Sequence, residues 1–339
     1  MSTRAGQAAT KAVRSALGFT AAKIASSDRL MSIVYDLMNE TNFAGLAEHE
    51  EMLSDSVRVA AYHRGIQRNV QPGDVVVDLG TGTGLLAFMA SRAGAKRVYA
   101  VEHSEFIEVA REIARHNGFT NIEFVQANSR EFTPPEKVDV VLHEQMGDEL
   151  FNENLVQNLL DVRDRFLRPH GRILPARFRL FVEPITMHES MRVRRFWNID
   201  LPDGIDLSAM RESPIAQRYE TGRNEQTWLR PGAVAGTLAA PKPILEFDLD
   251  TLASVDSLPT DFVVERTASA DMIVDGTCIW FEALFDDDTV LTTSPLAPIT
   301  SWGNRMYRLD QHFAKGEQLR LNVHMGRLVD PDTWIVMPL

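Results

Sequence analysis

The order of apolar and polar positions predicts helices near the N-terminus, followed by strands that alternate with helices. From about residue 30 to 70, apolar side chains such as Met52, Leu53 and Val57 recur at helical intervals. Residues 71–74 carry a turn signal, and the β-branched run at 75–77 predicts a short buried strand. Continuous apolar strands of this kind are typical of parallel sheets that are covered on both faces.

Strands and helices continue to alternate as far as Pro175. The apolar runs lie at 97–101, 122–125, 138–142 and 172–174, and the helical patterns lie at 85–92, 105–117 and 155–167. This alternation predicts a doubly wound α/β domain that ends near Pro175.

Beyond Pro175 the pattern changes to strands separated by Pro, Gly and Asp turns. They lie at 177–182, 244–247, 261–266, 278–285, 319–324 and 334–337. We therefore expect a second, mostly β domain, a barrel or a sandwich. A mixed stretch that contains Trp and Arg, from about 192 to 230, interrupts it.

Composition narrows the class of protein. The 339 residues are 44% hydrophobic, and no apolar stretch approaches the roughly 18 residues of a membrane helix. The net charge of −12 argues against a nucleic-acid binder and suits a cationic substrate, although solubility alone explains the charge. The lone cysteine, Cys278, rules out an internal disulfide framework and favours a cytoplasmic protein. The nine histidines lack metal-ligand spacing, so we expect no metal.

The first 27 residues contain no acid and carry four basic residues among Ala, Ser and Thr. An organelle targeting segment has such a composition. The segment runs without a break into a helical pattern at 33–38, so we favour an amphipathic helix or a frayed tail.

A glycine-rich loop follows the first strand. Residues 75–84 read VVVDLGTGTG, with Asp78 before Gly80, Gly82 and Gly84. Glycines there allow positive φ and let a ligand approach the backbone closely. Glu102 ends the next strand pattern, at the offset where an acid meets a ribose hydroxyl pair. The loop and the acid together predict a nucleoside-type ligand rather than a structural turn.

The spacing of the glycines separates two such ligands. A dinucleotide fingerprint needs a third glycine at the position of Leu85. The pattern is instead acid-x-GxGxG. It resembles the first motif of class I S-adenosylmethionine-dependent methyltransferases, and NAD remains the rival ligand.

Two glutamates follow the strand pattern at 138–142. Glu144 and Glu153 stand nine residues apart, on either side of a turn through Gly147. In an α/β sheet this loop lies beside the ligand crevice, where two carboxylates can converge on one cation. Considered alone, a solvated acidic loop is the better explanation of these two glutamates.

Four motifs resemble those of the protein arginine methyltransferase family. Residues 144–153 are similar to its double-glutamate loop, Glu-Trp-Met-Gly-Tyr followed four residues later by Glu. Residues 49–58 resemble its His-Glu-Glu-Met-Leu helix, and 294–302 its Pro-x-Thr-His-Trp loop. Residues 196–197 and 204–208 resemble the start of its dimerisation arm. The resemblance runs in family order from about residue 43 to near the C-terminus.

The resemblance implies an architecture. Helices in residues 1–70 would cap the cofactor site, 71–175 would form the Rossmann-like cofactor domain, and 176–339 a β-barrel substrate domain. A helical arm at about 192–230 would form a homodimer.

The resemblance also implies roles for individual residues. Arg58 would pair with the carboxylate of S-adenosylmethionine, Glu102 with its ribose, and Asn128 and Ser129 would border its adenine. S-adenosylhomocysteine would be the product. Met52, Met146, Ser301 and Trp302 would line the acceptor site.

The chemistry of the acceptor fits the two glutamates. A guanidinium stays protonated and presents a planar fork of donors, for which paired carboxylates are a natural clamp. The clamp would orient the attacking nitrogen toward the methyl group. Glu153 or Asp55 would take the released proton.

The chain departs from the family pattern around the acceptor. Only one aromatic residue remains in the counterpart of the family's tyrosine cluster, at 39–43. Ser301 replaces a histidine, so we expect its pairing with Asp55 to be lost. Gln145 and Asp148 replace aromatic residues. These changes indicate an altered acceptor rather than a lost reaction.

Four functions therefore remain open. The first is an arginine N-methyltransferase that acts on a protein or peptide, and the second acts on free arginine or another small guanidino compound. The third is a methyltransferase-like binding protein without catalysis, and the fourth is an NAD-dependent oxidoreductase.

Overall fold

A computed structural model describes residues 45–192, 194–219 and 226–339. The chain divides into two compact units, Met1–Glu50 and Glu51–Leu339, and the description below concerns the second. The expected helices before residue 45, the acid-free segment and the counterpart of the tyrosine cluster lie outside the described residues.

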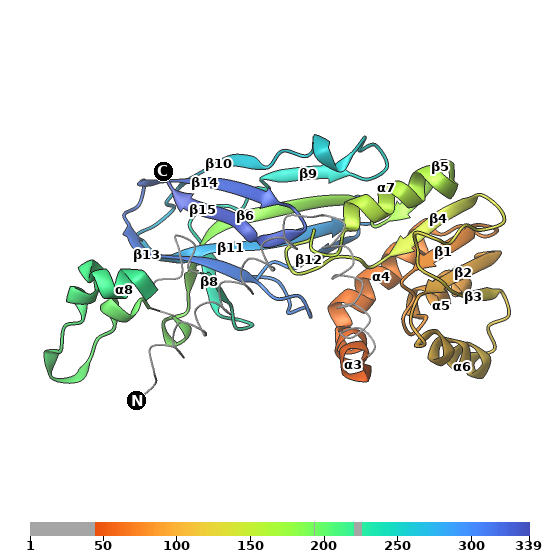
Figure 1. Ribbon diagram of the computed structural model, residues 1–339, viewed down its shortest axis with the longest axis horizontal. Helices are drawn as coiled ribbons and strands as arrows, with labels where there is room; N and C mark the ends of the chain where they lie inside the picture. The colour runs from red at the N-terminus through yellow and green to blue at the C-terminus, as the bar shows by residue number, and fades with distance from the viewer. Residues whose placement is uncertain (1–44, 193, 220–225) are drawn as a thin grey trace, which may run out of the picture. The chain divides into compact units, whose positions relative to one another are not determined.

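Two helices lead into the first sheet. Helix α3 spans Leu46–Ser54 and α4 spans Ser56–Asn69. Asp55 separates them because its carboxylate accepts a hydrogen bond from the Arg58 backbone N–H at 2.9 Å, the usual cap of a helix N-terminus. Helix α4 lies beside strand β12 (Val290–Thr292), a neighbour more than 200 residues away (Figure 1).

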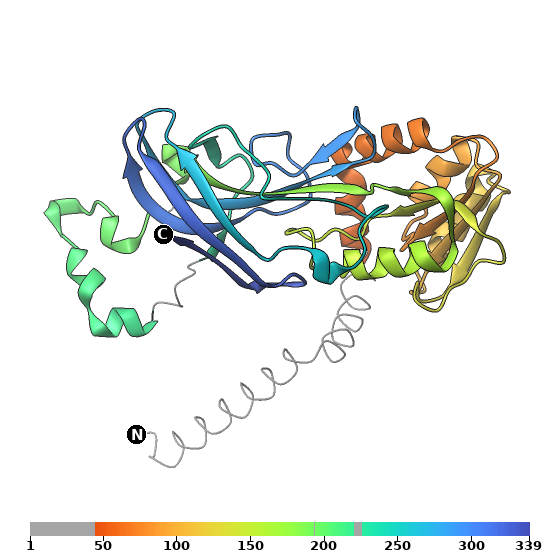
Figure 2. The same ribbon diagram turned by 90° about the horizontal axis from the view of Figure 1, so that it is seen from above.

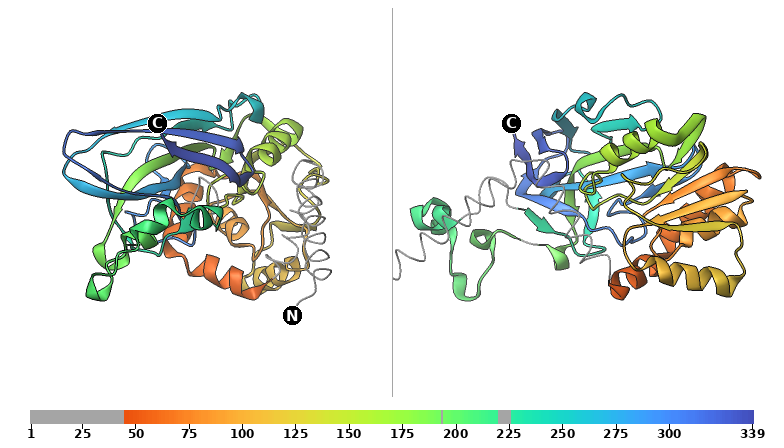
Figure 3. Two further views of the ribbon diagram at one scale, coloured as in Figure 1. Left: turned by 60° about the vertical axis from the view of Figure 1, so that its left-hand side comes forward. Right: turned by 45° about the vertical axis from the view of Figure 1, so that its right-hand side comes forward.

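The first sheet is parallel and has five strands in the order β3-β2-β1-β4-β5. These are β1 (Val75–Leu79), β2 (Arg97–Glu102), β3 (Ile122–Gln126), β4 (Val138–His143) and β5 (Leu167–Leu174). Helices α5 (Leu85–Arg92), α6 (Ile107–Asn117) and α7 (Leu155–Phe166) connect them. Helices α6 and α7 lie on opposite sides of the sheet (Figures 1 and 3). The strand order reverses at β1, and ligands bind such sheets at the carboxyl ends of the strands there.

The remaining strands form antiparallel sheets. One has the order β7-β13-β11-β6-β8, with β12 paired to β11 and β9 to β6, and the other has the order β10-β14-β15. Their bounds are β6 (Arg177–Met187), β7 (Gln226–Trp228), β8 (Val234–Thr237), β9 (Leu245–Asp248), β10 (Asp261–Thr267), β11 (Met272–Leu284), β13 (Arg305–Phe313), β14 (Gln318–Arg327) and β15 (Asp330–Pro338). A short helix η5 (Val255–Ser257) precedes β10.

A helical segment is inserted between β6 and β7. It contains η1 (Glu189–Met191), η2 (Phe196–Asn198), η3 (Pro202–Gly204), η4 (Ser208–Glu212) and α8 (Pro214–Tyr219). Figure 2 shows it, in green, projecting away from the sheets. Its root is fixed by Arg192, which donates to the buried Asp275 carboxylate at 2.6 Å.

The expected fold class is confirmed, with a parallel sheet followed by antiparallel sheets and a helical insertion. Local details differ from the prediction. Strand β5 begins at Leu167, five residues earlier than expected, because its first half is polar and carries no apolar run. Strands β7, β8, β12 and β13 were not predicted, because three of them are only three or four residues long and β13 buries only three of its nine positions.

Candidate active site

The glycine loop leaves β1 with a backbone that other residues rarely adopt. Gly80, Gly82 and Gly84 have φ values of +68°, +49° and +87°. A Cβ at Gly84 would lie 2.6 Å from the Phe88 ring, whereas a Cβ at Gly80 would meet no atom within 4 Å. The loop therefore presents bare backbone to open space at the carboxyl end of β1, which fits a closely bound nucleoside ligand.

Asp78 stabilises this loop through hydrogen bonds. Its side chain is fully buried, and its Oδ2 accepts hydrogen bonds from Thr81 Oγ1 at 2.5 Å and from the Ala87 N–H at 3.0 Å. Burial raises the pKa of Asp78 to about 7, against the effect of these hydrogen bonds. Asp78 thus joins the loop to the first turn of α5.

Glu102 ends β2 beside the same loop. Its oxygens accept from the Gly82 N–H at 3.1 Å and the Ser104 N–H at 3.0 Å. Burial alone would raise the pKa of Glu102, but hydrogen bonds from His103, Ser104 and Gly82 outweigh it and lower the pKa to about 2. The carboxylate is therefore ionised near neutral pH and is suited to accept from ribose hydroxyls.

Asn128 and Ser129 follow β3, the neighbour of β2. Asn128 Oδ1 accepts from the Arg130 N–H at 3.0 Å, and the Ser129 carbonyl accepts from Arg165 at 2.8 Å. The preceding Ala127 N–H donates to the Glu102 carbonyl at 3.0 Å. The structure thus brings the residues expected at the adenine next to the strand that ends in Glu102.

Arg58 contacts one of the two glutamates of the acceptor loop. Its guanidinium donates to Glu144 Oε2 at 2.5 Å, across 86 residues of sequence. The same guanidinium lies over the Trp302 ring, 5.3 Å from its centroid. The pair is largely enclosed, because the two side chains are only 13% and 18% exposed. Residues expected at the cofactor and at the acceptor therefore meet at one place.

Burial and neighbouring charges raise the pKa values of both glutamates. Burial raises the pKa of Glu144 to about 7, although Arg58 opposes this rise, and Asp55 adds to it. Burial also raises the pKa of Glu153 to about 8, with a further rise caused by the charge of Glu144. The charge of Glu144 thus acts on Glu153 in a poorly solvated place. Such a place favours a cation.

The loop that carries both glutamates is tightly fixed. Met146 is 2% exposed, and its carbonyl accepts from Trp302 Nε1 at 2.6 Å. A Cβ at Gly147 would meet the side-chain amide of Asn152, so a larger residue there would displace that amide. Phe151 packs against Phe247 of β9 with ring centroids 5.7 Å apart. The antiparallel sheets therefore hold the loop from the side opposite the parallel sheet.

The contact between Asp55 and the segment after β12 is preserved, contrary to our expectation for Ser301. Asp55 Oδ2 accepts from the Ser301 N–H at 2.7 Å and from its hydroxyl at 3.1 Å. The expectation was wrong because a backbone donor does not depend on the side chain that the family's histidine would supply. Met52 lies half-buried on α3, three residues before Asp55.

The sequence reasoning missed three residues of this region. Tyr62 is buried and donates to the His143 carbonyl at 2.9 Å. Its position one turn after Arg58 on the same helix is a signal that could have found it. Arg305 donates to the buried Glu149 at 2.5 Å, across 156 residues, and no local pattern marks this pair.

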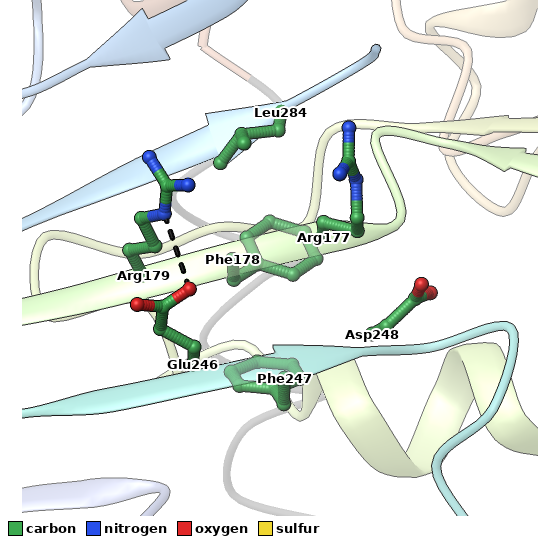
Figure 4. Close-up of a pocket in the computed structure, with 7 residues that line it drawn as sticks. All are labelled: Arg177, Phe178, Arg179, Glu246, Phe247, Asp248 and Leu284. Atoms are coloured by element: carbon green, nitrogen blue, oxygen red, sulfur yellow. Dashed lines mark hydrogen bonds and ion pairs between the residues drawn. The ribbon is translucent and has the colours of Figure 1, made fainter. Parts of the chain in front are cut away.

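Other site types find no support in the part of the chain that the structure describes. No group of three or more His, Cys, Asp or Glu side chains there is placed to hold a metal ion. No described helix is long and apolar enough to cross a membrane. A hollow of about 230 Å³ contains none of the predicted site residues in its lining, which is formed by Arg177, Phe178, Arg179, Glu246, Phe247, Asp248 and Leu284 (Figure 4).

Comparison with known proteins identifies the family. A methyltransferase-domain model matches residues 71–222. Protein arginine N-methyltransferase 6 of Danio rerio is 31% identical over 282 residues, which cover 81% of this chain and 80% of that protein. PRMT10 of Oryza sativa subsp. japonica is 31% identical over 318 residues, with 84% and 82% covered. Probable histone-arginine methyltransferase 1.4 of Arabidopsis thaliana is 30% identical over 304 residues, and the chain spans about half of it (55%).

Solved structures agree with this assignment. The Trypanosoma brucei PRMT1 enzyme-prozyme heterotetrameric complex with AdoHcy matches with a TM-score of 0.69 at 26% identity, and 83% of this chain and 88% of that chain are covered. A PRMT6-SAH structure matches in fold, with a TM-score of 0.67, 24% identity, and 87% and 100% of the chains covered. With the glycine loop and Glu102, these findings confirm S-adenosylmethionine as the cofactor and methyl transfer as the reaction, and they leave no support for NAD. The chain belongs to the protein arginine N-methyltransferase family.

Proposed function

We propose that this enzyme transfers a methyl group to a guanidino nitrogen of arginine in a protein or peptide, and that Glu144 and Glu153 clamp the guanidinium. The main support for the proposal is the position of Arg58, whose guanidinium donates a hydrogen bond to Glu144 at 2.5 Å. A place that already binds one guanidinium has the charge and the acceptors to bind another. Glu153, raised in pKa by burial and by Glu144, supplies the second carboxylate.

S-adenosylmethionine supplies an electrophilic methyl group when it is bound. Gly80 and Gly82 leave backbone exposed for its methionine part, and Gly84 starts the helix that follows. Glu102 would hold the ribose hydroxyls, and Asn128 and Ser129 would lie beside the adenine. Arg58, which binds Glu144, would pair with the carboxylate of the cofactor. Asp78 acts indirectly, because both hydrogen bonds to its Oδ2 come from the loop and from α5.

The clamp favours reaction in two ways. Carboxylates on two of the nitrogens draw positive charge toward themselves and leave the third nitrogen better able to attack, and they also orient it. Met52 and Met146 shape the space around that nitrogen, with Ser301 and Trp302 at its edge. Glu153 receives the proton, because its pKa of about 8 is close to the working pH. Asp55 is the second candidate for this role.

A small acceptor, such as free arginine, is the alternative. Gln145 and Asp148 stand where the family motif has aromatic residues, and they favour a more polar acceptor. We also propose that the protein is cytoplasmic and has three parts, 1–70, 71–175 and 176–339. It would form a homodimer through the inserted segment at 192–230. Exposed apolar side chains on this segment support the dimer: Ile199, Ile205, Met210 and Ile215 are 42%, 58%, 39% and 65% exposed.

Incubation with labelled S-adenosylmethionine and either an arginine-containing peptide or free arginine tests the proposal. Mass spectrometry should find methyl mass on the guanidino group of the peptide. E153Q should abolish it while retaining the thermal shift caused by S-adenosylhomocysteine. Methylation of neither acceptor, or an E153Q enzyme as active as the wild type, would contradict the proposal.

A further inference from the structure

Asp148 brings a third carboxylate to the double-glutamate loop. Its Oδ1 accepts from the Gly303 N–H at 2.6 Å, which fixes the side chain against the segment that follows Trp302. Among the described residues, no donor is bound to its Oδ2. The side chain is partly exposed, so this second oxygen can reach solvent or a ligand.

Hydrogen bonds place Asp148 next to residues expected at the acceptor. Gly303, which binds Asp148, directly follows Trp302, and Trp302 Nε1 donates to the Met146 carbonyl of the same loop at 2.6 Å. The charge of Asp148 also contributes to raising the pKa of Glu153, after burial, Glu144 and the opposing effect of Arg58. A cation held by Glu153 therefore lies within the electrostatic reach of Asp148.

Arg305 acts on Asp148 electrostatically but binds other groups. Burial raises the pKa of Asp148, and Arg305 opposes this rise, while the donors of Arg305 bind Glu149, Gln226 and Asp332. Within the described residues, no ion pair joins Asp148 to a basic side chain. Asp148 thus keeps a negative charge that the protein leaves without a direct partner.

An aromatic ring lies beside this carboxylate. A Cβ at Gly303 would lie 3.0 Å from the Trp228 ring and 3.5 Å from Asp148 Oδ1, so both flank the same glycine. Trp228 is 51% exposed, and Arg305 lies over its ring at 5.1 Å. A carboxylate next to an exposed indole is well suited to a positively charged group.

We propose that Asp148 is a specificity-determining residue, which selects acceptors that carry a second positive charge near the guanidinium. The proposal rests on the proposed function, because it takes Glu144 and Glu153 as the guanidinium clamp. The second charge is an ammonium or guanidinium group. It comes either from a side chain that flanks the target arginine in a peptide or from a small guanidino amine. A carboxylate at that position of the acceptor is repelled.

Two matched acceptor pairs test the proposal and separate the two sources. The peptide pair has one arginine flanked by lysine or by acetyl-lysine. The small pair is agmatine, which has an ammonium group, and 4-guanidinobutanoate, which has a carboxylate. We expect the wild type to prefer the dicationic member of at least one pair by about tenfold in kcat/KM, the effect of one charge-assisted contact. The pair in which this preference is found shows whether the second charge comes from a peptide side chain or from a small guanidino amine.

D148N should reduce this preference to less than about threefold, since the amide keeps an oxygen for Gly303 and loses only the charge. D332N is the matched control, because Asp332 also interacts with Arg305 but is 81% exposed and lies outside the glutamate loop. It should retain the wild-type preference. Melting temperatures of both variants verify that they are folded.

The outcomes distinguish the proposal from the function on which it rests. If the wild type methylates both members of each pair equally, or if D148N keeps the full preference, the specificity role is refuted while the methyltransferase proposal stands. If the wild type methylates none of the four acceptors although it binds S-adenosylhomocysteine, the proposed function fails and the specificity role fails with it.

Discussion

Replacing Glu144 by glutamine separates the catalytic use of this carboxylate from its effect on stability. Burial raises the pKa of Glu144 from 4.5 to about 7, even though Arg58 attracts its charge. A raised carboxylate pKa means that the folded protein holds the ionised form less favourably than the unfolded chain does. Glutamine is uncharged and keeps an oxygen for Arg58. E144Q should therefore stabilise the ligand-free protein.

The size of this effect depends on pH. The side chain is 18% exposed, so solvent screens it little. Each pH unit between 4.5 and the folded pKa of about 7 is worth about 1.4 kcal/mol, so the 2.5 units give at most about 3.5 kcal/mol near pH 8. Below pH 4.5 the carboxyl is protonated in both states and the difference disappears. The advantage of E144Q over the wild type therefore grows as pH rises through this window.

Turnover should change in the opposite direction. Each hydrogen bond from a guanidinium to an ionised carboxylate contributes about 1.5–3 kcal/mol. Loss of the charge of one clamp residue should therefore lower kcat/KM by about tenfold to a hundredfold. Binding of S-adenosylhomocysteine should be weakened far less than turnover. This combination is a trade-off between stability and activity at a functional site.

Thermal unfolding near pH 6 and pH 8, together with methyl-transfer rates, measures both effects. E246Q is the control, because Glu246 is 59% exposed and its ion pair is with Arg179, at 3.3 Å. It should change neither quantity. The reasoning fails if E144Q melts below the wild type near pH 8, if its advantage does not depend on pH, or if it retains full turnover.

Three further predictions concern the same region. The pKa of Glu153 is raised to about 8, so its carboxylate ionises as pH rises, and kcat/KM should increase between about pH 6 and 9. A flat pH profile would refute the role of Glu153. G84A should lower the melting temperature more than G80A, because only a Cβ at Gly84 meets a ring, at 2.6 Å. G80A should mainly reduce the thermal shift caused by S-adenosylhomocysteine. Equal melting temperatures of the two variants would contradict this prediction. S301A should cost less than about 1 kcal/mol, because the backbone N–H still binds Asp55 at 2.7 Å, and S301P should cost more; urea unfolding of both variants distinguishes them.

The cofactor half of the site could be predicted from sequence because its requirements are local. Gly80 and Gly84 adopt positive φ within a single loop, and Glu102 follows at the end of the adjacent strand. Parallel strands place their carboxyl ends at one edge of a sheet, so the alternation of strands and helices already brings these residues together. The spacing of Glu144 and Glu153 around Gly147 is local in the same way.

The other half of the site depends on contacts between distant segments. The pairing of Arg58 with Glu144 crosses 86 residues, and that of Ser301 with Asp55 crosses 246. In the second case a main-chain N–H makes the bond, and a main-chain donor has no signature in the sequence. The sequence by itself determined the cofactor loop, the two acidic positions and the order of strands, because these follow from backbone conformation and periodicity. Only the tertiary structure decided which charges face one another, since ion pairing depends on packing and burial that no local pattern encodes.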